Sequence, residues 1–261
     1  MPDLPLERID PDSDRAAFRQ IADHLRTLIQ RGTLQPGDRV PSEARLMEHY
    51  GVARMTVRQA LQVLRSEGLV VAEHGRGVFV RERPRVRRLA SDRFARGHRA
   101  RGKATFIAEV EESGSKPTVD TVEVTEEEAD ADVAERLGLQ AGARVIVRRR
   151  RYLIDGRPAE TAVSYLPAQI AAGTAIARPD SGPGGIYARL EELGHHLARF
   201  TEEVRSRMPL QEEARALRLP AGVPVFHLIR TAYDTTGRPV EVCDTVMSSD
   251  AHVLQYELPA Q

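Results

Sequence analysis

A stretch of 37 residues, Pro41–Gly77, constrains the fold of this chain more than any other part of its sequence. Its pattern predicts a helix, a tight turn, a second helix and two short strands. Ser42 has a side chain suited to a helix N-cap, and Gly51 suits the turn between the helices. The second helix is predicted over residues 53–67, because Gly68 is a residue type that commonly follows a helix end.

The second of these helices has two chemically different sides. Apolar residues recur at i, i+3, i+4 and i+7, which predicts one buried stripe: Val57, Ala60, Leu61 and Leu64. Arg54 and Arg58 are four residues apart and share a different face. A helix with one buried side and cationic and polar residues at its N-terminal end suits the major groove of DNA. After it, LVVAEH and GVFV predict two strands joined as a short hairpin or wing.

Together with FRQIADHLRTLIQRGTLQPGDRVPSE upstream, this stretch resembles the winged helix-turn-helix of the GntR family of bacterial transcription regulators, over roughly residues 15–80. The plainer alternative is an amphipathic helical hairpin that contacts another protein. The resemblance implies double-stranded operator DNA as a partner, contacted by the second helix and the wing tip. The positions that match the family's DNA contacts are Ala53, Arg54, Met55, Thr56, Arg58, His74 and Gly75. The DNA-binding residues that we expect are Ser42, Arg45, Arg54, Met55, Thr56, Arg58, His74, Gly75 and Arg76.

Within that set, Arg54 is the best candidate for a bidentate contact to guanine O6 and N7. Thr56 and Arg58 are expected to hold a phosphate or a base edge, and the residues alone do not separate these roles. Arg45 is open between a DNA contact and a solvated helix face. Ala53 stands where the family commonly has Ser or Thr, which is expected to shift the operator preference.

Charge is distributed unevenly along the chain, although Lys+Arg and Asp+Glu both total 38. Residues 1–104 contain 21 basic and 13 acidic side chains, whereas residues 105–261 contain 17 basic and 25 acidic ones. This division indicates that only the N-terminal part meets a polyanion. The boundary is expected in the Arg-rich segment 82–104, where no helical or strand period persists.

The C-terminal part contains an internal repeat. LGLQAGARVIVRRRRYLIDGRPAE, residues 137–160, aligns with LRLPAGVPVFHLIRTAYDTTGRPVE, residues 217–241. In this alignment Arg150 matches Arg230, and Glu160 matches Glu241. Each copy follows a short acidic helix and predicts a strand, a Gly-containing turn and a second strand. We therefore expect an α+β domain with two related halves, whose hairpins lie in one antiparallel sheet.

This part resembles the UTRA effector-binding domain of the HutC subfamily within GntR, over roughly residues 100–258. The matching pieces are TFIAEVEESG at 105–114, L-x-L-x-x-G at 137–142, DGRP at 155–158, SYLP at 164–167 and RTAYD…GRPVE at 230–241. The resemblance implies a fold like chorismate lyase, a small-molecule pocket and dimerisation through this domain. The predicted division is 12–81 for the winged helix-turn-helix, 82–104 for a linker and 105–258 for the effector domain.

Four consecutive arginines, residues 148–151, occupy a predicted strand. Alternation sends Arg148 and Arg150 to one face and the other two to the opposite face. One pair is expected either to bind an anionic effector, such as a phosphate or carboxylate, or to lie on a solvated face with an interface salt bridge. The effector-binding residues that we expect, four of them from the resemblance, are Thr105, Arg148, Arg150, Ser164, Tyr165 and Glu241.

The predicted function is a ligand-responsive, homodimeric DNA-binding repressor, released from a palindromic operator by a small-molecule effector. The alternative is an enzyme or a constitutive ligand-binding protein with a vestigial helix-turn-helix. No catalytic residues, metal site or cofactor are expected, because no nucleophile motif is present and the chain has one cysteine. A cytoplasmic location away from membranes is expected, since the sequence lacks a leading apolar segment and a run of about 18 apolar residues.

Overall fold

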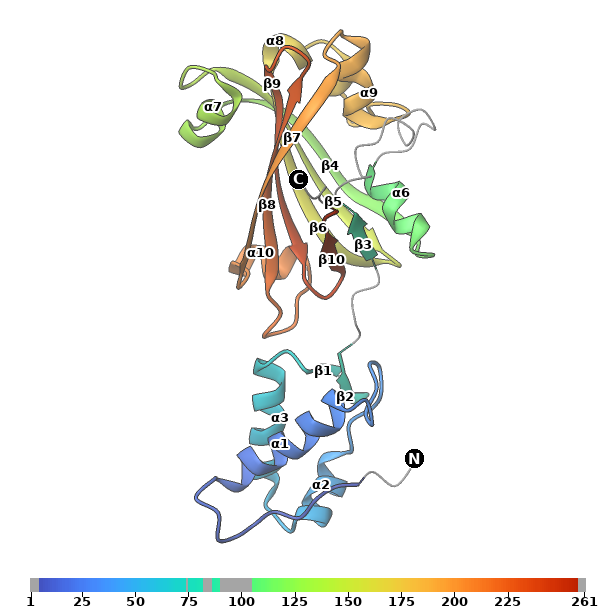
Figure 1. Ribbon diagram of the computed structural model, residues 1–261, viewed down its shortest axis with the longest axis vertical. Coiled ribbons are helices and arrows are strands. Elements are labelled where there is room, and N and C mark those ends of the chain that lie inside the picture. Colours follow the sequence, from blue (N-terminus) through green and yellow to red (C-terminus); the bar gives the residue numbers. More distant parts are fainter. Residues whose placement is uncertain (1–4, 74, 82–85, 90–104, 258–261) are drawn as a thin grey trace. The chain divides into compact units, whose positions relative to one another are not determined.

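The computed structural model (Figure 1) describes residues 5–73, 75–81, 86–89 and 105–257. These residues combine helices with antiparallel sheet, so the predicted α+β class is confirmed. The chain divides into two compact units, one N-terminal and one C-terminal, and each is described by itself.

The N-terminal unit is a winged helix-turn-helix. Its elements are α1 (Ala17–Gln30), α2 (Glu43–Tyr50), α3 (Arg54–Ser66) and the antiparallel strands β1 (Val70–Glu73) and β2 (Gly77–Val80). Ser42 caps α2, because its hydroxyl oxygen accepts a hydrogen bond from the Arg45 amide at 3.3 Å. Gly51 has a φ of 64°, the left-handed conformation that ends a helix at low steric cost. The turn and cap predicted from the sequence are therefore confirmed.

One apolar core holds the three helices and the wing together. The predicted stripe of α3 is buried, and it packs in a cluster with α1, α2 and both strands; the buried members include Ile21, Leu25, Leu46, Val57, Ala60, Leu61, Leu64, Val70 and Val80. Because α3 buries this stripe, the opposite side of the helix faces solvent. Arg54 and Arg58 lie on that exposed side, with side chains 70% and 62% accessible.

The C-terminal unit is built on a six-stranded antiparallel sheet in the order β4-β5-β6-β9-β8-β7. The strands are β4 (Pro117–Glu128), β5 (Arg144–Ile154), β6 (Arg157–Pro167), β7 (Leu197–Arg207), β8 (Val225–Asp234) and β9 (Pro239–Ser248). Its helical segments are α6 (Thr105–Glu112), α7 (Ala131–Leu137), α8 (Ala168–Ala171), η1 (Ala175–Ala177), α9 (Gly185–Glu192) and α10 (Gln211–Ala216). A separate parallel pair joins β3 (Val86–Leu89) to β10 (His252–Gln255).

The two halves of the sheet are related by the internal repeat. The predicted hairpins are β5–β6 and β8–β9, and they meet where β6 pairs with β9 at the centre of the sheet. The repeat also reaches further upstream than the sequence comparison indicated, since α6–β4–α7 and α9–β7–α10 occupy equivalent places. Gly114 and Gly194 end the two equivalent helices with φ values of 78° and 88°.

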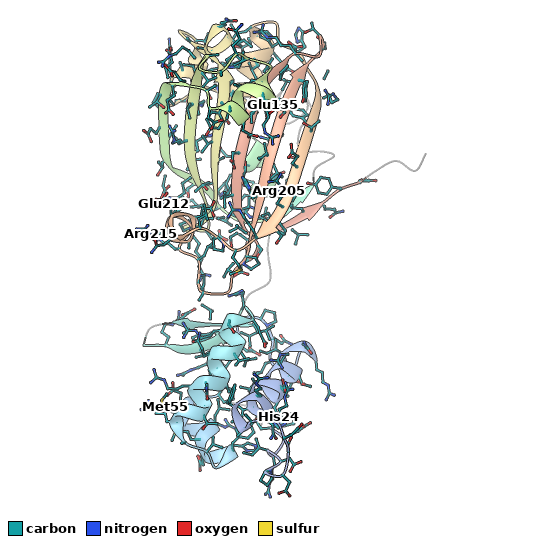
Figure 2. All side chains as sticks on the ribbon, turned by 90° about the vertical axis from the view of Figure 1, so that its left-hand side faces the viewer. His24, Met55, Glu135, Arg205, Glu212 and Arg215 are labelled. Carbon is teal, nitrogen blue, oxygen red and sulfur yellow. The ribbon has the colours of Figure 1, made fainter. Side chains whose placement is uncertain are left out.

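Helices cover both faces of this sheet. Ile146, Leu166 and Ala232 pack in one cluster with residues of α8, η1 and α9. Val147 and Val242, on the opposite face, pack against α7. Figure 2 looks onto that opposite face, with Glu135 of α7 near one end and Glu212 and Arg215 of α10 near the other. The first face is the one that contains the candidate ligand cavity described below.

Asp234 organises the turn between β8 and β9. One carboxylate oxygen accepts hydrogen bonds from the Thr236 amide (2.9 Å), the Thr236 hydroxyl (2.6 Å) and the Arg238 amide (3.1 Å), and the other lies 2.9 Å from His195 Nδ1. Burial favours the neutral acid, but the hydrogen bonds from His195, Thr236 and the backbone outweigh it and lower the pKa of Asp234 to about 2. The ionised carboxylate therefore stabilises the folded chain.

We expect Asp234→Asn to lower the free energy of unfolding by about 2 kcal/mol at pH 7. Because the folded pKa lies below the unfolded value, this contribution is full above about pH 5 and declines as the pH falls toward 2. Urea denaturation of both proteins at pH 7 and pH 3 tests this, and the difference between them should be about half as large at pH 3. An equal difference at both pH values would show that the charge of Asp234 is not what stabilises the turn.

Candidate functional site

The N-terminal end of α3 presents a group of exposed side chains. Arg54, Met55 and Arg58 project into solvent, and Met55 is 70% accessible. In Figure 2, Met55 lies at the outer edge of the unit, on the side away from His24 of α1. Thr56 is half-buried in the same turn of the helix. The surface therefore offers two cations and one flexible apolar side chain to a partner.

A carboxylate from the preceding helix contacts both of these arginines. Glu43 is the first residue of α2; its Oε2 accepts a hydrogen bond from Arg54 Nε at 2.7 Å, and its Oε1 lies 3.6 Å from Arg58 Nε. Glu43 was not among the predicted DNA-binding residues. Its place directly after Pro41 and Ser42, in the P-S-E motif, is the one signal that the sequence offers.

The remaining predicted DNA-binding positions lie on α2 and the wing. Ser42 is exposed although its oxygen serves as the helix cap, and Arg45 is half-buried on α2. Gly75 is exposed between the two wing strands with a φ of 72°. Arg76 donates a hydrogen bond to Glu73, and its guanidinium lies over the Phe79 ring. His74 falls outside the described residues.

The C-terminal unit contains a cavity of about 270 Å³ on one face of the sheet. Strands β5, β6, β8 and β9 contribute Arg150, Glu160, Arg230 and Cys243 to its wall. The rest of the lining comes from α6 (Phe106 and Ile107), from Val119 and Val122 of β4, from residues 179–182 and from the start of α9. A volume of this size accommodates a small metabolite.

Strand alternation divides the four consecutive arginines as predicted. Arg148 and Arg150 line the cavity. On the other face, Arg149 donates to both carboxylate oxygens of Glu127 at 2.7 and 3.0 Å, and Arg151 does the same to Asp120 of β4. The hydrogen bonds from Arg149 lower the pKa of Glu127 to about 2. One pair therefore faces the cavity and the other forms ion pairs with the edge strand.

Arg148 anchors the segment that leads into the cavity wall. Its Nη1 donates to the carbonyl oxygens of Ile176 and Arg178, and its Nη2 donates to the Pro179 carbonyl at 3.0 Å. Burial lowers the pKa of Arg148 to about 10, so the side chain remains a cation at neutral pH. These bonds use most of its terminal N–H groups, which makes Arg150 the better placed of the two for an external anion.

A chain of polar contacts crosses the buried end of the cavity. Arg150 Nη2 donates to the Ser164 hydroxyl, which donates to Glu241 Oε1 at 2.7 Å. The Tyr187 hydroxyl donates to Glu241 Oε2 at 2.5 Å and accepts from Arg230 Nε at 3.0 Å. Burial, foremost, raises the pKa of Tyr187, which therefore stays a neutral hydrogen-bond donor. Tyr187 thus ties α9 to the central strands of the sheet.

The predicted effector-binding residues do not all lie at the cavity. Arg150, Ser164 and Glu241 come together, and Arg148 lines the same cavity. The expectation for Tyr165 is corrected: it follows Ser164 on a strand, so it points to the opposite face and packs in the cluster on α7. The side chain of Thr105 lies outside the described residues.

Sequence reasoning did not single out Tyr187, Arg230, Glu160 or Cys243 as cavity residues. Arg230 and Glu160 had a usable signal, because the internal repeat aligns them with Arg150 and Glu241. Tyr187 and Cys243 had none. Among the described residues, no cluster of three or more His, Cys, Asp or Glu side chains could hold a metal ion. Likewise, no helix in the described part of the chain is long and apolar enough to cross a bilayer.

A winged helix with an exposed, cationic second helix defines the class of DNA-binding transcription regulators, and the same chain contains a second domain with a cavity that could hold a small metabolite. Residues 17–80 match the gntR family of bacterial regulatory proteins, and residues 112–253 match the UTRA domain. The chain belongs to the GntR family and to its UTRA-containing members.

Sequence similarity to known proteins extends over nearly the whole chain. An HTH-type transcriptional regulator of Streptomyces coelicolor is 32% identical over 92% of this chain and 91% of its own length. The HTH-type transcriptional repressor NagR of Bacillus subtilis is 27% identical over 94% of this chain and 95% of its own length. The crystal structure of PhnF from Mycobacterium smegmatis has a TM-score of 0.59 and 26% identity, covering 92% of this chain and 99% of PhnF. The chain is therefore a DNA-binding transcription regulator and not an enzyme.

Proposed function

We propose that this protein is a HutC-type repressor of the bacterial cytoplasm that binds a palindromic operator as a homodimer. A small anionic molecule, bound in the cavity of the C-terminal unit, releases it from DNA. The observation that carries this proposal is the state of Arg150, a cavity cation whose contacts do not include a carboxylate.

The surroundings of Arg150 support an anionic ligand. Its described contacts are the Ser164 hydroxyl and the Tyr152 ring, and its Nε is buried with no hydrogen-bond partner among the described residues. Arg230, by contrast, lies 3.7 Å from Glu202. Arg150 is linked to the Glu241 carboxylate through the Ser164 hydroxyl, and a phosphate or carboxylate in the cavity could accept two parallel hydrogen bonds directly from the guanidinium. Binding of such a group would give the guanidinium a direct anionic partner.

The glycine-rich turn before α9 supports the same ligand class. Gly182, Gly184 and Gly185 line the cavity, and their φ values of 81°, 78° and 67° lie in the left-handed region that favours glycine. Gly185 is also the first residue of α9, an eight-residue helix whose N-terminal amides favour negative charge. Arg148 holds the preceding segment in place through its three carbonyl contacts.

A route for the ligand response runs through α6 and β3. Val86 of β3 packs in one cluster with Phe106 of α6 and Tyr152 of β5, and the last two line the cavity. Along the chain, β3 is the first described strand after the wing. A ligand that shifts α6 would therefore act where the chain from the DNA-binding unit enters the second unit. Release from DNA requires that the ligand bind the released arrangement more tightly than the DNA-bound one.

Dimerisation is expected through the C-terminal unit. Its sheet ends in two long strands, β4 and β7, and no described strand pairs with either outer edge. Unpaired edges of this length favour pairing with a second copy, and a two-fold dimer matches a palindromic site. Full-length protein should sediment as a dimer at micromolar concentration. A monomer under these conditions would contradict the proposal.

The single cysteine provides a direct test of the cavity. Cys243 is the one cysteine of the chain, is 3% accessible and lines the cavity. Phosphorylated and carboxylated metabolites are screened for release of fluorescent operator DNA, and each active compound is then tested for protection of Cys243 from a thiol reagent. At 100 times its Kd, a ligand in this cavity should slow labelling about 100-fold. A compound that releases DNA without protecting Cys243 would place the effector site elsewhere.

A further inference from the structure

The recognition helix does not present its two arginines independently. Glu43, on a different helix, contacts both: its two oxygens lie 2.7 Å from Arg54 Nε and 3.6 Å from Arg58 Nε. The arginines are four residues apart on α3, so their side chains leave the same face one turn apart. One carboxylate therefore bridges the two cations across the helix-turn-helix.

The atoms used in this bridge matter for base recognition. Glu43 contacts each guanidinium at Nε, and these contacts do not use the two terminal nitrogens, Nη1 and Nη2, of either arginine. A guanidinium recognises guanine by donating two parallel hydrogen bonds to O6 and N7. With Nε engaged, the pair of terminal nitrogens is the part of Arg54 that remains for this contact. The bridge thus selects an end-on approach to the base.

The bridge contributes to orientation more than to the stability of the fold. The side chains of Arg54 and Arg58 are 70% and 62% exposed, and that of Glu43 is 32% exposed. Exposed ion pairs add little to folding stability. A long side chain that is already held in its bound geometry, however, loses less conformational freedom on binding. The effect of Glu43 is therefore expected in DNA recognition.

We propose that Glu43 is a positioning residue for base readout: it holds Arg54 and Arg58 with their terminal nitrogens directed outward, so that they meet guanine edges in the operator. This inference rests on the proposed readout of DNA by Arg54. Glu43 also places a negative charge near the DNA surface, which opposes binding to any sequence. It therefore raises sequence discrimination while reducing affinity for random DNA.

The experiment compares operator and random-sequence DNA, at one salt concentration, for full-length wild type, Glu43→Gln, Glu43→Asp and Arg54→Ala. Glu48→Gln is the matched control, because Glu48 is an exposed carboxylate on the same helix. Glu43→Gln should lower the ratio of operator to random-DNA affinity by about fivefold per half-site while random-DNA affinity stays equal or rises. Glu43→Asp keeps the charge but is too short to bridge both arginines, so the ratio should fall there as well. Thermal unfolding verifies that each variant is folded.

Each other result overturns the inference. An unchanged or higher ratio in Glu43→Gln would show that Glu43 only masks the cations. The same fall in Glu48→Gln would show that net charge, not the bridge, sets the ratio. A wild-type ratio of operator to random-DNA affinity in Glu43→Asp would show that sequence discrimination does not need a carboxylate that bridges both arginines. If Arg54→Ala leaves the ratio of operator to random-DNA affinity unchanged, the proposed readout by Arg54 is wrong. If Arg54→Ala lowers this ratio but Glu43→Gln does not, only the role proposed for Glu43 is wrong.

Discussion

Arg54→Ala should lower the ratio of operator to random-DNA affinity by about a thousandfold. A bidentate arginine–guanine contact contributes about 2 kcal/mol of discrimination, and a dimer on a palindrome makes that contact twice. Arg54 is 70% exposed on α3, and its described contact is the hydrogen bond to Glu43. The fold should therefore persist, because truncating an exposed side chain removes no core packing.

The measurement is fluorescence anisotropy of operator and random DNA at matched salt, together with the slope of log affinity against log salt. Loss of a base contact should change the ratio strongly and the slope little. Loss of a phosphate contact would instead weaken binding to both DNAs and reduce the slope by about 1 per phosphate. An unchanged ratio would remove Arg54 from the reading surface.

The second large effect is expected at the cavity. Arg150→Met should abolish release by the effector and leave operator binding near the wild-type value. Coupling between two sites typically changes affinity by about 5- to 150-fold, and that whole factor should be lost. The fold should tolerate the change, because methionine is a flexible apolar side chain that fills much of the same space without requiring hydrogen-bond partners. Ser164 and Glu241 keep their mutual hydrogen bond.

Arg149→Met is the matched control, since Arg149 is the neighbouring residue on the same strand and points to the opposite face, where it pairs with Glu127. It should retain effector release. Effector affinity of the wild type is measured with and without saturating operator, and linkage requires the two ligands to weaken each other by the same factor. Equal effector affinities would show that the cavity does not control DNA binding. Loss of release in both variants would point to a general effect on the sheet.

Local signals were sufficient for the DNA-binding unit. The cap at Ser42, the left-handed Gly51 and the apolar stripe of α3 each depend on residues within a few positions of one another, so their consequences can be derived from the sequence. The paired hairpins were predictable for the same reason, because each strand and its turn are contiguous. The alternation of a strand also separated Arg148 and Arg150 from Arg149 and Arg151.

Contacts between distant segments needed the tertiary structure. Tyr187 contacts Glu241 of β9 because α9 packs against one face of the sheet. No spacing along the chain predicts this contact. Glu43 reaches Arg54 only after the turn at Gly51 has brought α2 against α3. The prediction for Tyr165 was wrong because Ser164 and Tyr165, which belong to one sequence motif, were both assigned to the cavity. Consecutive residues on a strand point to opposite faces of the sheet. The sequence by itself therefore determined the elements and the class of protein; burial of apolar surface between those elements decided which polar side chains meet, and hence the site.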